Sequence, residues 1–170
     1  MRRLLYLAAV AMTVAADLPA AAADRDMLPK FADYPVKVYR GRIASPRFAT
    51  AFQRDYRIQF EDATRAKVDA AGHYVVVRLP CGSACVMAEL LDARSGRIVN
   101  LFTVSSWREV GDDFDAVESR ANSRLIVFHG QRNEAGVNGN HYYLIEPGGP
   151  LRHLRTLDTD GNFETAPKLK

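Results

Sequence analysis

The chain has 170 residues, with 23 lysine and arginine residues against 20 aspartate and glutamate residues, and its formal net charge at pH 7 is +3. The basic residues form no run that could neutralise a track of phosphates, so we expect no nucleic-acid partner. After the N-terminal segment, no stretch is long and apolar enough for a bilayer-spanning helix, so we expect no transmembrane segment in the mature chain.

The N-terminal segment has the organisation of a secretory signal peptide. Arg2 and Arg3 form a positive start, and residues 4–16 form an uncharged, mostly apolar stretch. This stretch is shorter than the roughly 20 residues that a membrane-spanning helix needs. The pattern therefore favours a cleaved signal peptide over a retained membrane anchor.

The cleavage site is predicted from the small residues that follow the apolar stretch. Ala21 and Ala23 form the A-x-A pattern, which places the cut after Ala23, with an earlier cut near Ala16 as an alternative. We thus predict a signal peptide at residues 1–23 and a single exported domain at residues 24–170, periplasmic or secreted.

The first predicted elements are an edge strand and a helix. Residues 36–42 (VKVYRGR) alternate apolar and charged side chains, which predicts a short strand at a sheet edge. Ser45 and Pro46 resemble a helix start, and the segment that follows is predicted as a helix to about Ala70. Its apolar face is formed by residues three or four apart, which are Phe48, Phe52, Tyr56, Phe60 and Ala63. Because Tyr56, Ile58 and Phe60 also alternate, a strand over part of this segment is the alternative.

The rest of the chain has the pattern of β-strands joined by turns. A polar stretch at residues 105–122 is predicted as a long connection and residues 131–139 as a Gly/Asn-rich loop. The predicted strands cover residues 73–79, 86–93, 97–104, 124–129, 140–146 and 151–157. We expect an α+β fold that is mainly antiparallel β, with a meander sheet of six to seven strands, propeller-blade-like turns and one main N-terminal helix.

Three short motifs carry a resemblance to a known group of proteins. They are Ala71-Gly72-His73-Tyr74, then Cys81-Gly82-Ser83-Ala84-Cys85, then Asp92-Ala93-Arg94-Ser95-Gly96-Arg97. In this order they resemble uncharacterised secreted proteins of Gram-negative bacteria. This chain departs from the pattern at Leu79-Pro80, where the group has Trp-Gly, and at Ala84, where it has glycine. The resemblance covers about residues 31–104, and it implies a compartment and a fold but no activity.

Cys81 and Cys85 are predicted to form a disulfide across a tight turn. They are the two cysteines of a chain that we expect to be exported, and oxidising compartments favour disulfides. The spacing differs from the C-x-x-C of thiol oxidoreductases, so we favour a structural bond over a redox-active one.

Two histidines are candidate ligands at the mouth of the 131–139 loop. If Gly130 faces Asn140 in a hairpin, His129 faces His141 on the same side of the sheet. With Glu134 they would form a speculative binding or metal site, whereas a slip of one residue would send the histidines to opposite faces.

Acidic residues suggest two weaker ion sites. Asp112, Asp113, Asp115 and Glu118 are close together in the sequence, but they lack the spacing of an EF-hand, so a solvated acidic loop is favoured over a calcium site. For the same reason residues 158–162 are predicted as a turn.

The function that these features favour is a small periplasmic binding or interaction module, such as an inhibitor or immunity-type protein. Its partner would be an unknown protein or a component of the cell envelope, and no cofactor is expected. The alternative is a periplasmic enzyme. It would be either a metal-assisted hydrolase that uses His129 and His141 or a thiol-disulfide protein that uses Cys81 and Cys85.

Overall fold

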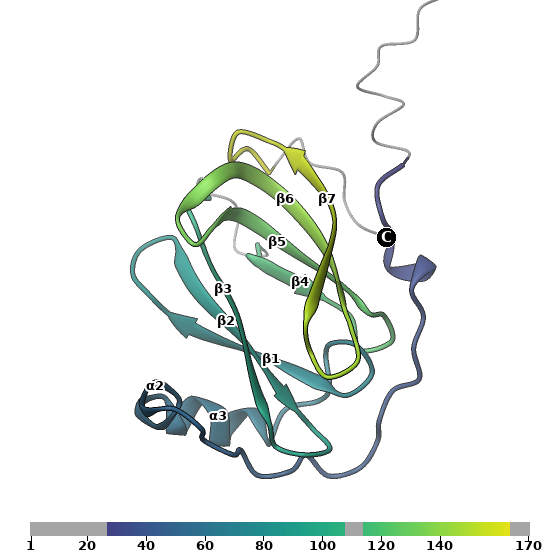
Figure 1. The fold of residues 1–170 in the computed structure, drawn as a ribbon, viewed down its shortest axis with the longest axis vertical. Helices are drawn as coiled ribbons and strands as arrows, with labels where there is room; N and C mark the ends of the chain where they lie inside the picture. Colours follow the sequence, from purple (N-terminus) through teal and green to yellow (C-terminus); the bar gives the residue numbers. More distant parts are fainter. Residues whose placement is uncertain (1–26, 108–113, 164–170) are drawn as a thin grey trace, which may run out of the picture.

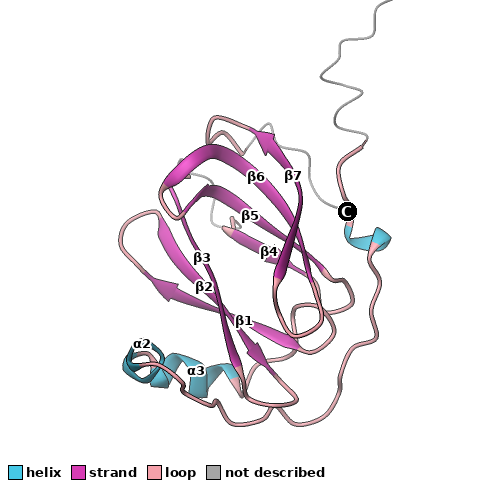
Figure 2. Cartoon of the chain, in the orientation of Figure 1, coloured by secondary structure: helices cyan, strands magenta, loops and turns pink. Residues whose placement is uncertain are grey.

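The computed structural model describes residues 27–107 and 114–163, so the predicted signal peptide lies outside the described residues. The described chain forms one seven-stranded antiparallel sheet, with two short helices together at one side and a short helical turn near the N-terminus at the other (Figure 1, Figure 2). The expected class, mainly antiparallel β in meander order, is confirmed. The strands are β1 (Tyr74–Pro80), β2 (Cys85–Asp92), β3 (Ile98–Ser105), β4 (Val117–Ser119), β5 (Leu125–Arg132), β6 (Ala135–Ile145) and β7 (Leu151–Asp158). The helices are η1 (Phe31–Asp33), α2 (Ala51–Asp55) and α3 (Arg57–Ala63).

The sheet consists of two meanders with a narrow junction. Strands β1, β2 and β3 pair in sequence, as do β5, β6 and β7, while β3 meets β5 only through Val104 with Arg132 and Ser105 with Gln131. The rest of that edge of β5 pairs with β4. One edge of β5 is thus divided between β3 and β4. Because β3 pairs with β5 at only two positions, the two meanders can fold toward each other.

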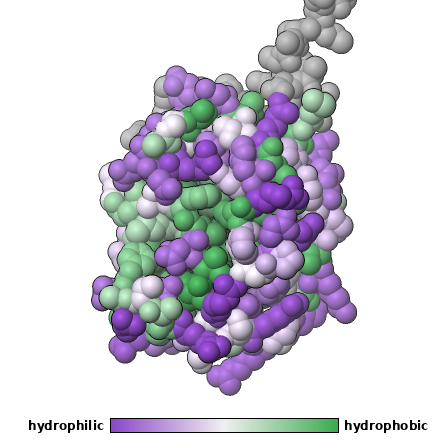
Figure 3. All heavy atoms as spheres, in the orientation of Figure 1, coloured by the Kyte–Doolittle hydropathy of each residue, from purple (hydrophilic) through white to green (hydrophobic). Residues whose placement is uncertain are grey.

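The main core lies between the two meanders. Val76 and Leu90 from the first meander and Ile126, Phe128 and Tyr143 from the second belong to one buried cluster. Partly buried residues on β2 and β3 extend this cluster toward the surface. Figure 3 shows hydrophobic residues in the middle of this face, surrounded by hydrophilic residues.

Two smaller cores cover the outer faces of the sheet. The helices pack on β1 and β2, and the N-terminal segment with Leu28 and Phe31 packs on β5 and β6. Among the described residues, no helix is long and apolar enough to cross a membrane.

The predicted helix is two short helices instead of one long one. Thr50, and not Ser45, caps α2: its side chain accepts from Gln53 N, and the Gln53 side chain bonds back to the cap. The helical segment breaks at Tyr56 and ends at Ala63, well before Ala70. The predicted apolar face is nevertheless confirmed, because its five residues all belong to the cluster on β1 and β2. Phe60 is fully buried, which stabilises this packing by about 2 to 3 kcal/mol.

The predicted strand at residues 36–42 is not part of the sheet. This segment lies outside every helix and strand and runs along residues 70–73, just before β1. Val36 N donates to Asn122 O at 2.9 Å and Tyr39 N donates to Gly72 O at 2.6 Å. The alternating pattern therefore predicts a strand wrongly, because these single hydrogen bonds form no ladder with any of the described strands.

The predicted loop at residues 131–139 is a β-hairpin. β5 continues to Arg132 and β6 begins at Ala135, which leaves Asn133 and Glu134 as a two-residue turn. Both turn residues have positive φ, 51° and 59°, as a type I′ turn requires. The predicted connection at residues 105–122 also contains the short strand β4.

Candidate functional site

The two candidate histidines do not converge. His129 pairs with Asn140 and Phe128 pairs with His141, a register one residue away from the one that the histidine pairing needs. Since successive side chains of a strand point to opposite faces, His129 and His141 lie on opposite faces of the sheet.

His141 is a buried structural residue. Its Nε2 lies 2.9 Å from Gly130 O and 3.1 Å from Val137 O, and its Nδ1 lies 3.0 Å from Thr156 Oγ1. Carbonyl oxygens only accept hydrogen bonds, so Nε2 carries the proton and Nδ1 accepts from the Thr156 hydroxyl. Burial, followed by the charge of Arg132, lowers the pKa of His141. The neutral ring makes these three contacts with both of its nitrogens.

His129 lies in a separate small cluster. Its Nδ1 is 2.8 Å from Asn140 Oδ1 and its Nε2 is 3.5 Å from Glu118 Oε2, with Phe114 and Phe163 against the ring. Glu134, the third expected ligand, is exposed at the hairpin turn. Within residues 27–107 and 114–163, no three His, Cys, Asp or Glu side chains are close enough to hold a metal ion. The residues expected to form a metal site are therefore not brought together.

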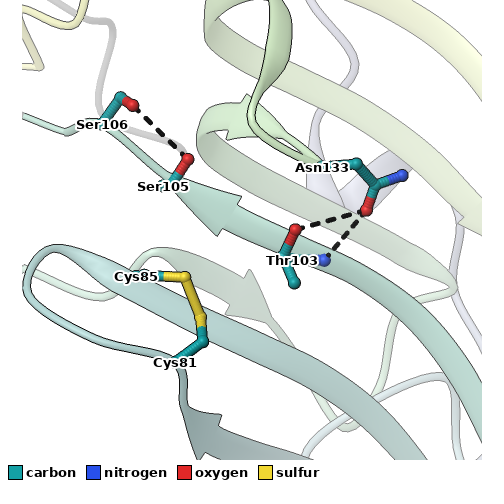
Figure 4. The surroundings of a disulfide bond; sticks show 6 residues. All are labelled: Cys81, Cys85, Thr103, Ser105, Ser106 and Asn133. Carbon is teal, nitrogen blue, oxygen red and sulfur yellow. Dashed lines mark hydrogen bonds between the residues drawn. A yellow bond between two sulfur atoms is a disulfide. The ribbon is translucent and has the colours of Figure 1, made fainter.

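The predicted disulfide is present. Cys81 and Cys85 are bonded, with their Cα atoms 5.2 Å apart, across the turn that follows the last pair of β1 and β2, Pro80 with Val86 (Figure 4). Cys85 also pairs with Ser105 on β3. The bond therefore closes the hairpin at one end of the first meander, which fits the structural role predicted for it.

The acidic residues that the structure describes have other partners. Arg78 Nη2 binds Asp115 Oδ2 at 2.6 Å and Arg78 Nη1 lies 3.8 Å from Asp69 Oδ2. Asp112 and Asp113 lie outside the described residues. Asp158 Oδ1 accepts from Asp160 N, as expected of a turn.

A pair of adjacent hollows lies beside the extended segment. They have volumes of about 570 and 350 Å³, and both are lined by Val38, Tyr39 and Arg40. Lys37 and Arg94 line the larger hollow, and Lys67 lines the smaller one together with residues 41, 43, 66 and 68. We call the two hollows and their lining residues the basic groove.

The charge of the basic groove is not compensated locally. Among the described residues, no carboxylate lines either hollow, and Lys37, Arg40, Lys67 and Arg94 form no ion pair. The nearby Asp92 is engaged in its own turn, where its carboxylate accepts from Arg94 N and from the Ser95 hydroxyl. Four cations thus face solvent around the two hollows.

Tyr39 is held between the two hollows. Its backbone N–H donates to Gly72 O, its hydroxyl donates to Arg42 O at 3.3 Å, and the Arg94 guanidinium lies 5.7 Å from its ring centroid. These contacts fix the ring where the hollows meet and place Arg94 over it.

Gly72 allows the close approach on which the groove depends. It has a φ of 79°, and a Cβ at this position would lie 2.6 Å from Lys37 O. Ala93 N donates to His73 O at 2.8 Å, which ties the turn carrying Arg94 to the same place. Two of the three motifs behind the sequence resemblance, residues 71–74 and 92–97, therefore meet behind the groove.

His73 adds no charge to this region at neutral pH. Burial, followed by the positive charge of Arg94, lowers its pKa. The positive charge of the groove therefore rests on its lysine and arginine side chains.

The basic groove was not predicted from the sequence. Residues 36–42 contribute Lys37, Tyr39 and Arg40 to it, but their alternating pattern predicts only a strand. Lys67 and Arg94 come from other parts of the chain, and no spacing rule connects them.

No protein-family profile matches the chain, and neither does any curated protein or any solved structure.

Proposed function

We propose that the protein is a small exported binding module, periplasmic or secreted, that uses the basic groove to hold an acidic partner. The observation that carries this proposal is the set of four cations around two adjoining hollows, none of which forms an ion pair with another described residue. Charged groups whose own chain does not neutralise them are available to an anionic partner, and they accelerate association as well as selecting it.

The composition of the groove supports binding more than catalysis. Its polar lining consists of Lys37, Tyr39, Arg40, Lys67 and Arg94, and it has no histidine, cysteine, serine or carboxylate among the described lining residues. Such a lining offers hydrogen-bond donors and a ring surface, which suit recognition of anionic groups.

The proposed location rests on two features. The N-terminal sequence has the pattern of a signal peptide, and the disulfide between Cys81 and Cys85 belongs to an oxidising compartment. Both fit a protein that works outside the cytoplasm.

Capture from periplasmic extract with two matched charge reversals tests the proposal. Arg40→Glu changes the residue that lines both hollows, whereas Arg54→Glu makes the same change of charge at an exposed position on α2 that lines neither hollow. We expect the unaltered protein and Arg54→Glu to retain the same partner and Arg40→Glu to lose it. Equal capture by both variants, or no capture by the unaltered protein, would contradict the proposal.

A further inference from the structure

We propose that the partner contributes an extended acidic segment, which pairs with residues 36–42 as an added β-strand along the basic groove. This inference rests on the proposed function and names the chemistry of the partner and its mode of binding. Three features of the groove carry it: an unpaired backbone, the two hollows and the uncompensated charge.

The first feature is a strand-like segment without a partner strand. Residues 36–42 have the alternating sequence of a strand and run extended from the N-terminal segment toward the helices (Figure 1). Lys37, Val38 and Arg40 make no backbone–backbone hydrogen bond with any other described residue. Backbone groups of this kind are satisfied by water in the free protein and are available to another chain.

Beside Gly72, the backbone groups of the segment alternate between a side that faces this glycine and a side that faces away from it. In an extended chain, the N–H and C=O of successive residues point to opposite sides. Tyr39 N donates to Gly72 O, and Lys37 O would lie 2.6 Å from a Cβ atom on Gly72. The backbone groups of residues 37 and 39 therefore face Gly72. Val38, which lies between them, consequently presents its backbone groups away from Gly72, and the backbone groups of Arg40 have no backbone partner among the described residues.

The segment is already held in place at both ends. Tyr34 O accepts from Arg124 N at 2.9 Å before it, and Ala44 N donates to Ala93 O at 2.8 Å after it. A partner strand therefore meets a preorganised edge and loses less entropy on binding than it would with a free loop.

The second feature is that two hollows lie along this edge. Side chains on one face of a strand recur about every 7 Å. Strand addition commonly combines main-chain hydrogen bonds with pockets for alternate side chains. The hollows on either side of Tyr39 offer such places to two residues of the incoming strand.

The third feature is charge, which selects the occupant. Lys37, Arg40, Lys67 and Arg94 favour glutamate or aspartate in the added strand. The same cations oppose pairing with a second copy of this edge, because like charges would then face one another across the strands. The groove thus fits an acidic segment of a different protein better than self-association.

Synthetic peptides test the inference directly. The first probe is a fluorescent ten-residue peptide of alternating glutamate and valine, compared by anisotropy with a peptide in which lysine replaces glutamate. Two further probes carry N-methyl groups on all glutamates or on all valines, because each set blocks one edge of an extended strand.

We expect the glutamate peptide to bind the protein and the lysine peptide to bind at least about tenfold more weakly. One N-methylated peptide should lose about tenfold or more in affinity, and the other should bind nearly as the parent peptide does, since only one edge faces the protein. Arg40→Glu should weaken binding, while Arg54→Glu should not.

A backbone variant of the protein gives an independent readout. Val38→Pro removes an N–H that has no partner among the described residues, so the thermal transition should change little, while peptide binding should be lost. If the proline variant melts normally and binds the peptide unchanged, the added strand does not form.

The outcomes separate this inference from the proposed function. If Arg40→Glu loses the captured partner but both N-methylated peptides bind as the parent does, the groove binds acidic partners without strand pairing, and the inference is wrong. The inference is also wrong if the glutamate peptide does not bind, or if inorganic polyphosphate displaces the captured partner while the peptide cannot.

Discussion

Glu89 on β2 provides a sharp test of how this fold tolerates a buried carboxyl group. It pairs with Val77 on β1 and Asn100 on β3, on the face of the sheet that the helices cover, and it is only 4% exposed. Its Oε2 has no hydrogen-bond partner among the described residues. Burial raises its pKa from 4.5 to about 7, and no charged group among the described residues offsets the effect.

This shift makes the folded state bind the Glu89 proton more tightly than the unfolded state does. Below pH 4.5 the carboxyl is protonated in both states and costs nothing. As the pH rises from 4.5 to about 7, the unfolded state ionises first, so the protein loses stability, and above about 7 the loss is complete. Each tenfold difference in proton affinity is worth about 1.4 kcal/mol, so the whole loss is about 3 kcal/mol.

The substitution Glu89→Gln removes this ionisation and keeps the shape of the side chain. We expect urea unfolding to show that Glu89→Gln gains about 3 kcal/mol relative to the unaltered protein between about pH 4 and pH 8. Glu61→Gln, at an exposed position on α3, is the control and should show no comparable gain. If the stability difference between Glu89→Gln and the unaltered protein is the same at both pH values, Glu89 is not the buried proton-binding group described above.

Three further substitutions test the packing. Gly72→Ala places a Cβ 2.6 Å from Lys37 O at a positive φ, so urea unfolding should show a loss of about 2 kcal/mol; a change within a few tenths would refute the close approach. Changing Cys81 and Cys85 together to serine should lower the free energy of unfolding by less than about 3 kcal/mol, because the disulfide closes a short loop. Calorimetry with and without reductant measures this loss. A larger loss would mean that the bond does more than close one turn. Phe60→Ala should cost about 3 to 5 kcal/mol in chemical unfolding, and a loss below about 1 kcal/mol would contradict its full burial.

Most of the sheet could be predicted because its strands combine apolar runs with clear turn residues. The turn at residues 92–96 is one example, since Asp92 accepts from Arg94 N and Ser95 Oγ as an aspartate in a turn commonly does. The apolar face of the helical segment was also predictable, because the apolar residues that pack on the sheet are three or four positions apart. The break at Tyr56 does not change that spacing, so the sequence pattern does not predict it.

The histidine pairing failed because hairpin register depends on turn geometry. The residues after Gly130 look like a loop, but Asn133 and Glu134 adopt positive φ and close a two-residue turn. The register then shifts between Gly130 and Arg132, which leaves His129 beside Asn140. A single-residue difference of this kind reverses the face of every later side chain, and composition alone does not reveal it.

The basic groove could not be predicted because it is a product of the tertiary structure. Lys37 and Arg40 precede β1 by more than thirty residues, while Lys67 follows α3 and Arg94 lies in a turn after β2. Gly72 and the turn at residues 92–96 bring these segments together through backbone hydrogen bonds, which depend on the whole fold.

The narrow junction between the two meanders has a consequence for the way the chain folds. Pairing within each meander joins strands that follow one another in sequence, so these hairpins can form early and at a low cost in loop closure. The long-range step is the docking of one meander on the other, which creates the core around Phe128 and Tyr143. Only Val104 with Arg132 and Ser105 with Gln131 guide this step through strand pairing. The folding barrier should therefore lie in the assembly of the shared core, after the separate meanders have formed.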